Sequence, residues 1–167
     1  MKRVAIVGPE STGKTDLAKV LAKEYQGIYV PEFSREYLNR LNAPYQQKDL
    51  LEIAKGQVEA LEHSDSAEVL IADTDLHVIK VWSEYKYGNC DPWILKKLSE
   101  QAFDLYILTY CDIPYEDDPL RENPEERPYF FDIYLNLLTR SKLPFIVVKG
   151  SRAARLQMAK KRIDALL

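Results

Sequence analysis

The stretch that decides the fold is GPESTGKT, residues 8–15, which directly follows the apolar run VAIV, residues 4–7. It matches the pattern G-x-x-x-x-G-K-[ST] of the Walker A phosphate loop without a gap. Glycines at positions 8 and 13 allow the backbone to curl tightly, so that successive N–H groups point at one anion. A helix after the loop adds the positive end of its dipole at the same place. The stretch therefore predicts a strand, a phosphate-binding loop and a helix, in that order.

Such a loop predicts that the chain binds ATP with Mg²⁺. Lys14 is expected to reach the β- and γ-phosphates, and the Thr15 hydroxyl to hold the metal ion. A glycine-bearing turn without a ligand is the alternative. The β-branched strand before the loop and the amphipathic helix after it favour the phosphate loop. The residues expected to bind the nucleotide here are Gly8, Glu10, Ser11, Thr12, Gly13, Lys14 and Thr15.

The bulk composition is that of one ordinary globular domain, which we expect to span residues 1–167. The chain has 46% hydrophobic residues, 29% charged residues and a net charge of −3, so it carries no general basic field for nucleic acid. Its cysteines, at positions 90 and 111, indicate reduced thiols rather than a disulfide framework or a zinc site. We see neither a signal peptide nor an apolar run that could span a bilayer. We therefore expect a cytoplasmic protein without membrane or nucleic-acid partners.

Strand-like and helix-like segments alternate along the rest of the chain. Four runs indicate strands, at residues 27–30, 68–72, 104–109 and 145–148. Apolar residues at helical spacing predict helices at about residues 50–63, 78–85, 91–98, 129–140 and 156–166. This alternation predicts an α/β fold with a parallel sheet. Ligands of such sheets bind beyond the carboxyl ends of the strands, so the residues that follow strands are candidates for a site.

Two carboxylates follow predicted strands. Asp73 ends the run 69–72 and is the candidate Walker B group that holds Mg²⁺ against Thr15, although it could instead cap the next helix, as Thr74 or Asp75 could. Glu32 follows the second strand and could orient an acceptor hydroxyl and take its proton. Asp73 could also serve as that base.

Arg35 stands three residues after Glu32 and could contact a phosphate or an acceptor oxygen. The simpler alternative is a solvated Glu–Arg pair at a helix start, which is worth little energy.

Residues 112–128 are rich in proline and charge, which is typical of a lid over an active site. A closing lid could bring a cation to the γ-phosphate, and Arg121 is a better candidate than Arg127. The alternative is an acidic surface loop whose arginines balance the local charge. With the lid interpretation, the expected catalytic residues are Lys14, Glu32, Asp73 and Arg121.

Weaker signals concern the two ends of the expected ligand. Gly150 and Ser151 follow the last strand, where an adenine base could lie. Trp82 shares a helix face with Asp75 and could stack on a planar cationic base, although such aromatic residues more often belong to the core. His63 and His77 show no metal-ligand spacing and receive no role.

Together these residues resemble the nicotinamide riboside kinase domain of NadR-type proteins, within the nucleoside and nucleotide kinase group. The resemblance covers nearly the whole chain. It rests on the loop at 8–15, EFSREY at 32–37, IADTD at 71–75, FD at 103–104, DDPLR at 117–121 and YF at 129–130. It implies a three-layer P-loop kinase fold, in which a five-stranded parallel sheet of strand order 2-3-1-4-5 lies between helices.

The resemblance also implies a reaction, in which ATP and nicotinamide riboside give ADP and nicotinamide mononucleotide. The acceptor nucleoside is expected to contact Glu32, Arg35, Tyr37, Asp73, Asp75 and Trp82. Bifunctional members of the family carry a nucleotidyltransferase domain and often a DNA-binding region, neither of which we expect in this chain. The residues leave open a kinase for another nucleoside or small metabolite, and a regulatory nucleotide-binding ATPase. They do not predict the oligomeric state.

Overall fold

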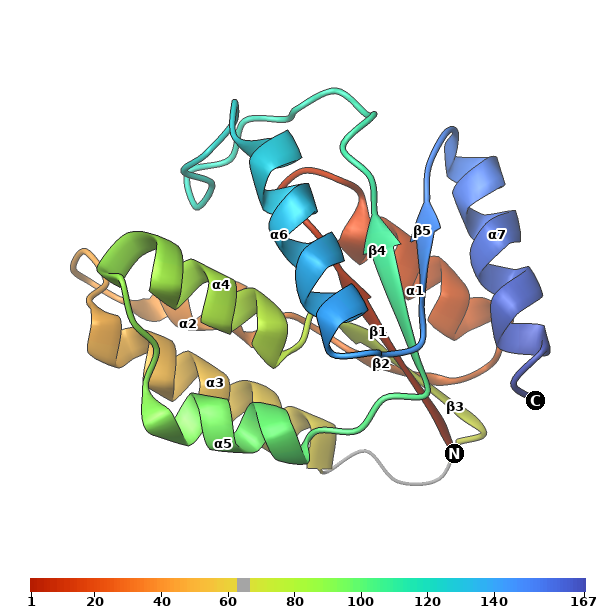
Figure 1. Ribbon diagram of the computed structural model, residues 1–167, viewed down its shortest axis with the longest axis horizontal. Coiled ribbons are helices and arrows are strands. Elements are labelled where there is room, and N and C mark those ends of the chain that lie inside the picture. Colours follow the sequence, from red (N-terminus) through yellow and green to blue (C-terminus); the bar gives the residue numbers. More distant parts are fainter. Residues whose placement is uncertain (63–66) are drawn as a thin grey trace.

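A five-stranded parallel sheet of order β2-β3-β1-β4-β5 forms the centre of the computed structural model, which describes residues 1–62 and 67–167 (Figure 1). The strands are β1 (Lys2–Val7), β2 (Ile28–Val30), β3 (Val69–Asp73), β4 (Leu105–Thr109) and β5 (Phe145–Val148). Every neighbouring pair is parallel. The strand order and the parallel arrangement implied by the family resemblance are confirmed.

Helices cover both faces of the sheet, which makes three layers (Figure 1). Their bounds are α1 (Lys14–Glu24), α2 (Phe33–Arg40), α3 (Gln47–Glu62), α4 (Leu76–Tyr87), α5 (Pro92–Glu100), α6 (Arg127–Arg140) and α7 (Arg152–Asp164). Among the described residues, no helix is both long and apolar enough to cross a membrane.

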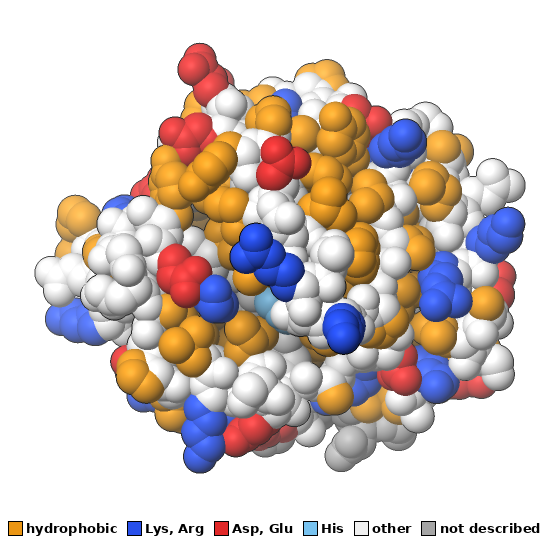
Figure 2. Space-filling view, in the orientation of Figure 1, with side chains coloured by type: hydrophobic (Ala, Val, Ile, Leu, Met, Phe, Trp, Pro, Cys, Tyr) orange, Lys and Arg blue, Asp and Glu red, His pale blue; other side chains and the backbone are white. Residues whose placement is uncertain are grey.

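The alternation of side chains along β1 divides the core between the two faces. Val4 and Ile6 pack with residues of α1 and α7, whereas Ala5 and Val7 pack with residues of α4 and α6. All four side chains are fully buried. A separate cluster joins α3, α4 and α5 beside the sheet. On the face shown in Figure 2, Lys and Arg side chains are interspersed with Asp and Glu.

The register brings the carboxyl ends of the central strands together. Asp73 of β3 lies beside Ile6 of β1, and Val7 lies beside Leu108 of β4. The phosphate loop leaves β1 at this edge and leads into α1. The segment between β4 and α6, residues 110–126, passes over the same edge without regular structure (Figure 1). We call it the β4–α6 segment.

One helix, α2, was not among the predicted elements. Its eight residues bury little apart from Ser34, so they lack the apolar period that reveals a helix in sequence. The other predicted helices are confirmed with shifts of a few residues at their ends. The predicted end of α3 at residue 63 and His63 itself lie outside the described residues.

A buried ion pair fixes the start of α4. Thr74 has a φ of 99°, a strained value for a β-branched residue, and it turns the chain so that Asp75 enters the core. Asp75 caps α4 by accepting the His77 backbone N–H at 3.1 Å, and its other oxygen contacts the His77 Nδ1 atom. Gln101 Nε2 donates to that second oxygen at 2.7 Å. Burial alone would lower the His77 pKa, but the Asp75 carboxylate outweighs burial and raises it above 6.5.

We predict that this pair stabilises the fold most at acidic pH. A histidine whose pKa rises on folding contributes stability that is complete below its unfolded pKa and is lost as the pH rises through its folded pKa. The difference in free energy of unfolding between the wild type and His77→Gln should therefore shrink as the pH rises above about 6.5. Urea denaturation at several pH values measures it. A difference that grows over this range would contradict the assignment.

Candidate functional site

The phosphate loop depends on a close approach between β1 and β4. Gly8 has a φ of 142°, and a Cβ atom there would lie 2.4 Å from the Thr109 hydroxyl oxygen. The Thr109 and Thr12 hydroxyl oxygens are 2.7 Å apart, and the Thr12 hydroxyl donates to the Pro9 carbonyl at 2.8 Å. Gly13, with a φ of 80°, begins α1. The backbone is therefore held in the curled form that phosphate binding requires.

Lys14 and Asp73 place opposite charges beneath the loop. Lys14 Nζ donates to the Pro9 carbonyl at 2.7 Å. Burial lowers the Lys14 pKa, although Glu32, Asp73 and Glu10 favour its charged form. Burial also raises the pKa of Asp73, against the opposing effects of the Thr15 hydroxyl and Lys14. The site thus concentrates ionisable groups where water is largely excluded.

The donors around Asp73 fit a magnesium ion bound together with a nucleotide. Asp73 is only 1% exposed, and its Oδ1 atom has no hydrogen-bond partner among the described residues, while Tyr29 donates to Oδ2 at 3.3 Å. An unpartnered buried carboxylate oxygen beside the Thr15 hydroxyl is a hard-oxygen donor set of the kind Mg²⁺ prefers. The described residues hold no cluster of three or more His, Cys, Asp or Glu side chains that could bind a metal alone. Phosphate oxygens and water would have to supply the remaining ligands.

Glu32 precedes α2 and is positioned by residues that the sequence analysis did not select. The Ser34 hydroxyl donates to Glu32 Oε1 at 2.7 Å. Gln57 of α3, which is fully buried, accepts the Phe33 backbone N–H at 2.9 Å and donates to the Pro31 carbonyl at 3.3 Å. Both backbone neighbours of Glu32 are therefore fixed to α3. In the sequence Gln57 stands among the apolar positions of an amphipathic helix, which indicates a buried polar group but not its partners.

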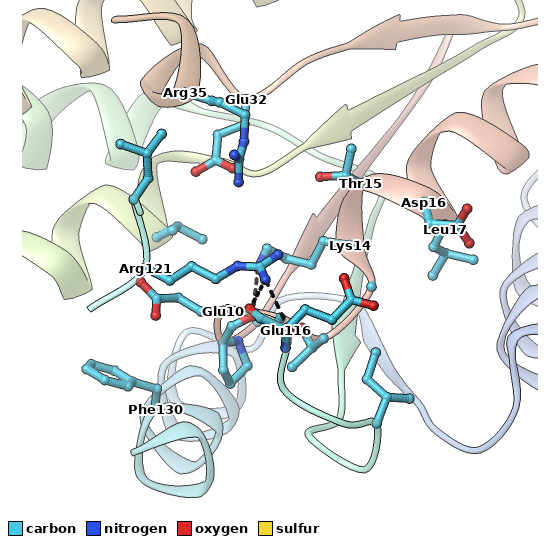
Figure 3. A pocket seen from close by; sticks show the side chains of 18 of the residues that line it. Glu10, Lys14, Thr15, Asp16, Leu17, Glu32, Arg35, Glu116, Arg121 and Phe130 are labelled. Atoms are coloured by element: carbon cyan, nitrogen blue, oxygen red, sulfur yellow. Dashed lines mark hydrogen bonds between the residues drawn. The ribbon is translucent and has the colours of Figure 1, made fainter. Parts of the chain in front are cut away.

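The β4–α6 segment contacts the phosphate loop at Ser11. The Ser11 hydroxyl oxygen accepts the Glu116 backbone N–H at 2.9 Å and Arg121 Nη1 at 3.3 Å. Arg127 Nη1 donates instead to the Ser11 and Ile113 carbonyls, at 3.0 and 2.9 Å. Figure 3 shows Arg121 beside Lys14, with Glu32 on one side and Glu10 on the other. Arg121, but not Arg127, lines the cleft.

A cleft of about 1210 Å³ connects these residues. One end lies over the phosphate loop and the starts of α1 and α7. The other end is walled by Trp82, Tyr85, Phe130 and Tyr134, and Glu32 and Arg35 also line the cleft. Trp82 therefore faces the cleft, and Arg35 also forms an ion pair with Asp118 at 2.8 Å. The cleft can hold a polyphosphate at one end and a flat, apolar group at the other.

Several predicted site residues do not line this cleft. Tyr37 faces away and donates its hydroxyl to Asp49 at 2.7 Å, and Asp75 is fully buried with His77. Gly150 and Ser151 form the turn before α7, where Ser151 caps the helix by accepting the Ala154 N–H at 3.1 Å. Asp73 lies directly beneath the cleft rather than on its surface. Their ligand-binding roles remain predictions.

Arg155 is the residue that sequence reasoning missed at the nucleotide end. It is 5% exposed and donates to the carbonyls of Thr12, Tyr110 and Gly150, at 2.6, 2.9 and 3.0 Å, as well as to the Asp112 carboxylate. Burial alone would raise the pKa of Asp112, but the Gly150 N–H and Arg155 lower it. One side chain thus joins the phosphate loop, the end of β4 and the β5–α7 turn. In the sequence it looks like an ordinary polar position of an amphipathic helix.

The family described as an AAA domain matches residues 3–155. The chain belongs to that family. Two curated relatives are similar in sequence to this chain. They are the trifunctional NAD biosynthesis/regulator proteins NadR of Salmonella typhimurium and Escherichia coli, which are 27% and 26% identical to it over 157 residues. Each alignment covers 89% of this chain and 38% of the relative, so the chain spans less than two fifths of their length. The resemblance to NadR-type proteins is confirmed.

Solved structures of similar shape confirm the fold class. A crystal structure of NadR protein in complex with NR has a TM-score of 0.83 at 22% identity, covering 98% of this chain and 51% of that chain. Deoxyadenosine kinase from M. mycoides has a TM-score of 0.67 at 14% identity, covering 99% of this chain and 100% of that chain. The fold of this AAA-domain family member is therefore that of the P-loop kinases.

We predict that Arg155→Met destabilises the protein by about 3 kcal/mol, because it removes the Arg155 hydrogen bonds to the Asp112 carboxylate and to three carbonyls. Arg152→Met, on the same helix, is the matched control. Its ion pair with Asp16 is exposed, with side-chain exposures of 72% and 55%, and should contribute much less to stability. Chemical denaturation compares the two variants. Equal losses would show that Arg155 does not hold the loops together.

Proposed function

We propose that this chain is an ATP-dependent kinase that phosphorylates nicotinamide riboside to nicotinamide mononucleotide. The observation that carries the proposal is the lining of one cleft, which combines the phosphate loop, the Glu32 carboxylate and several aromatic side chains. The relatives support the acceptor, because NadR is named for NAD biosynthesis and crystal structures of it contain NR, or NAD with AMP-PNP.

In this proposal the chain's residues act mainly by position and charge. The loop amides and Lys14 bind the β- and γ-phosphates, and Arg121 balances the charge that develops on the transferring group. Glu32 accepts the hydrogen bond of the acceptor 5′-hydroxyl and receives its proton as the oxygen attacks phosphorus. The leaving group is ADP, and no covalent bond to the protein is formed. Asp73 remains the alternative base, although its depth beneath the cleft favours a metal-binding role.

Magnesium completes the nucleotide site in this proposal. The Thr15 hydroxyl and the free Oδ1 atom of Asp73 would hold it. A magnesium ion held there would neutralise part of the phosphate charge and so favour attack by the acceptor hydroxyl.

The aromatic end of the cleft favours a flat, positively charged base. Trp82, Tyr85 and Phe130 offer faces or edges, and the acidic side chains of Glu32 and Glu122 also line the cleft. Cations bind well over aromatic rings and near carboxylates. The family's description as an AAA domain fits both a kinase and a regulatory ATPase. The aromatic end of the cleft favours a kinase, because it offers a place for an acceptor.

We also propose a cytoplasmic location. Cys90 and Cys111 are both free thiols, which persist in reducing compartments.

We predict that nicotinamide riboside accelerates ADP release from MgATP, because the γ-phosphate then has an acceptor beside Glu32. Adenosine, deoxyadenosine, cytidine and nucleoside monophosphates form the comparison panel. ADP release is followed in a coupled assay. Stimulation by another nucleoside instead would show that this nucleoside, and not nicotinamide riboside, is the acceptor. Hydrolysis that no acceptor stimulates would favour a regulatory ATPase.

We predict that Glu32→Gln lowers kcat by about 10²- to 10⁴-fold while leaving ATP affinity largely unchanged, because the amide cannot accept the proton. Lys14→Ala should abolish turnover and weaken ATP binding as well. Glu36→Gln, an exposed residue of α2 paired with Arg40, is the matched control and should leave kcat unchanged. Steady-state kinetics and calorimetry with AMP-PNP separate the two effects. Loss of ATP binding in Glu32→Gln would contradict an acceptor-side role.

A further inference from the structure

Tyr45 connects two parts of the cleft, α4 and the β4–α6 segment, that are far apart in the sequence. It lies between α2 and α3, outside the cleft lining, and its hydroxyl is the centre of a hydrogen-bond network. Trp82 Nε1 donates to it at 2.9 Å and Lys86 Nζ at 2.6 Å, both from α4. The hydroxyl itself donates to the Glu122 carboxylate, with oxygen distances of 2.8 and 2.9 Å. The sequence analysis gave no role to Tyr45.

On one side, Tyr45 fixes the orientation of the indole that walls the aromatic end. The two rings meet edge to face, with centroids 5.1 Å apart and an interplanar angle of 73°. A half-buried indole N–H needs an acceptor, and Tyr45 supplies it. Rotation of Trp82 would break this hydrogen bond and the ring contact together. The ring face that Trp82 presents to the cleft is therefore set by a residue behind it.

On the other side, Tyr45 holds the β4–α6 segment through Glu122. The Glu122 carboxylate also contacts Lys86 at 3.3 Å. The backbone N–H of the same residue donates to the Glu10 carboxylate of the phosphate loop at 3.2 Å, as does that of Asn123. Glu122 thus contacts Tyr45 and Lys86 through its side chain and the phosphate loop through its backbone.

We propose that Tyr45 is a positioning residue that couples binding of the acceptor base to closure of the β4–α6 segment over ATP. This inference rests on the proposed function. A base stacked on Trp82 favours the indole orientation that Tyr45 stabilises, and Tyr45 in that position favours Glu122 in its place over the phosphate loop. A nucleotide that orders the same segment favours the same arrangement from the other end. The two ligands should therefore each increase the affinity for the other by the same factor.

A second link between α2 and the segment, the Arg35–Asp118 ion pair, does not contact Trp82. It can hold the segment near the cleft, but a ligand bound at the aromatic wall does not change its contacts through Trp82. The coupling, rather than the affinity of either ligand alone, is therefore the property that distinguishes Tyr45.

The experiment measures nicotinamide riboside binding by calorimetry, with and without saturating Mg-AMP-PNP. For the wild type we expect the analogue to tighten acceptor binding by about 5-fold or more. Tyr45→Phe keeps the ring but removes the hydroxyl, and should reduce this factor to about 2-fold or less. Glu122→Ala removes the carboxylate but keeps the backbone N–H, and should have the same effect. The double variant should lose no more coupling than either single variant, because both changes break one link.

Tyr25→Phe is the matched control. Tyr25 also donates its hydroxyl to a carboxylate, Asp164 at 2.6 Å, but on a surface outside the cleft. It should keep the wild-type coupling. Melting curves confirm that each variant is folded, and Glu122→Ala tests the same link if Tyr45→Phe fails to fold.

The outcomes separate this inference from the proposed function. Wild-type protein that binds no nicotinamide riboside in either condition would remove the proposed function and the inference with it. Binding without any effect of the analogue would leave the function standing and overturn the coupling. Full coupling in folded Tyr45→Phe or Glu122→Ala would overturn the role of Tyr45.

Discussion

The rest of the structure depends on the close contact of β1 and β4 where the phosphate loop begins. The hydrogen atom of Gly8 occupies the space in which any Cβ atom would meet Thr109. This contact allows the loop to curl so that its backbone N–H groups point inward. Arg155 then holds the loop to two neighbouring turns. The helix dipole of α1, the charge of Lys14 and the hydroxyl of Thr15 all depend on that loop for their direction. A rigid loop is needed because its amides must already point at the anion before it arrives.

Burial of charged side chains at the cleft lowers the stability of the fold but strengthens their interactions with a charged ligand. Burial shifts the pKa of Lys14 downward and that of Asp73 upward, so each group would prefer to be neutral if it were alone. Asp73 and Glu32 favour the charged form of Lys14, and Lys14 and the Thr15 hydroxyl favour the charged form of Asp73. Such arrangements are typical of active sites, where interactions with a charged ligand gain strength as water is excluded. Thr74, the residue after Asp73, has a strained φ, which adds a conformational free-energy cost at the same edge of the sheet.

The sequence was sufficient for features that depend on local pattern. The loop at residues 8–15, the buried strands and the long helices follow from glycine spacing and apolar period, whereas the strand order required the family resemblance. Asp75 shows the limit of that reasoning, because helix spacing placed it on the face of Trp82 while the turn at Thr74 directs it into the core. Arg155, Gln57 and Tyr45 could not be predicted, since their partners are distant in sequence and only the packed fold brings them together.

The central claim is that the cleft brings the γ-phosphate of ATP to the 5′-oxygen of a nucleoside held beside Glu32. The most direct measurement is ³¹P NMR of the product formed from MgATP and nicotinamide riboside. Our account predicts a new phosphate monoester resonance that is split by the two 5′ protons, together with the resonances of ADP. A spectrum that contains only inorganic phosphate and ADP, or unchanged ATP with well-folded protein, would contradict it.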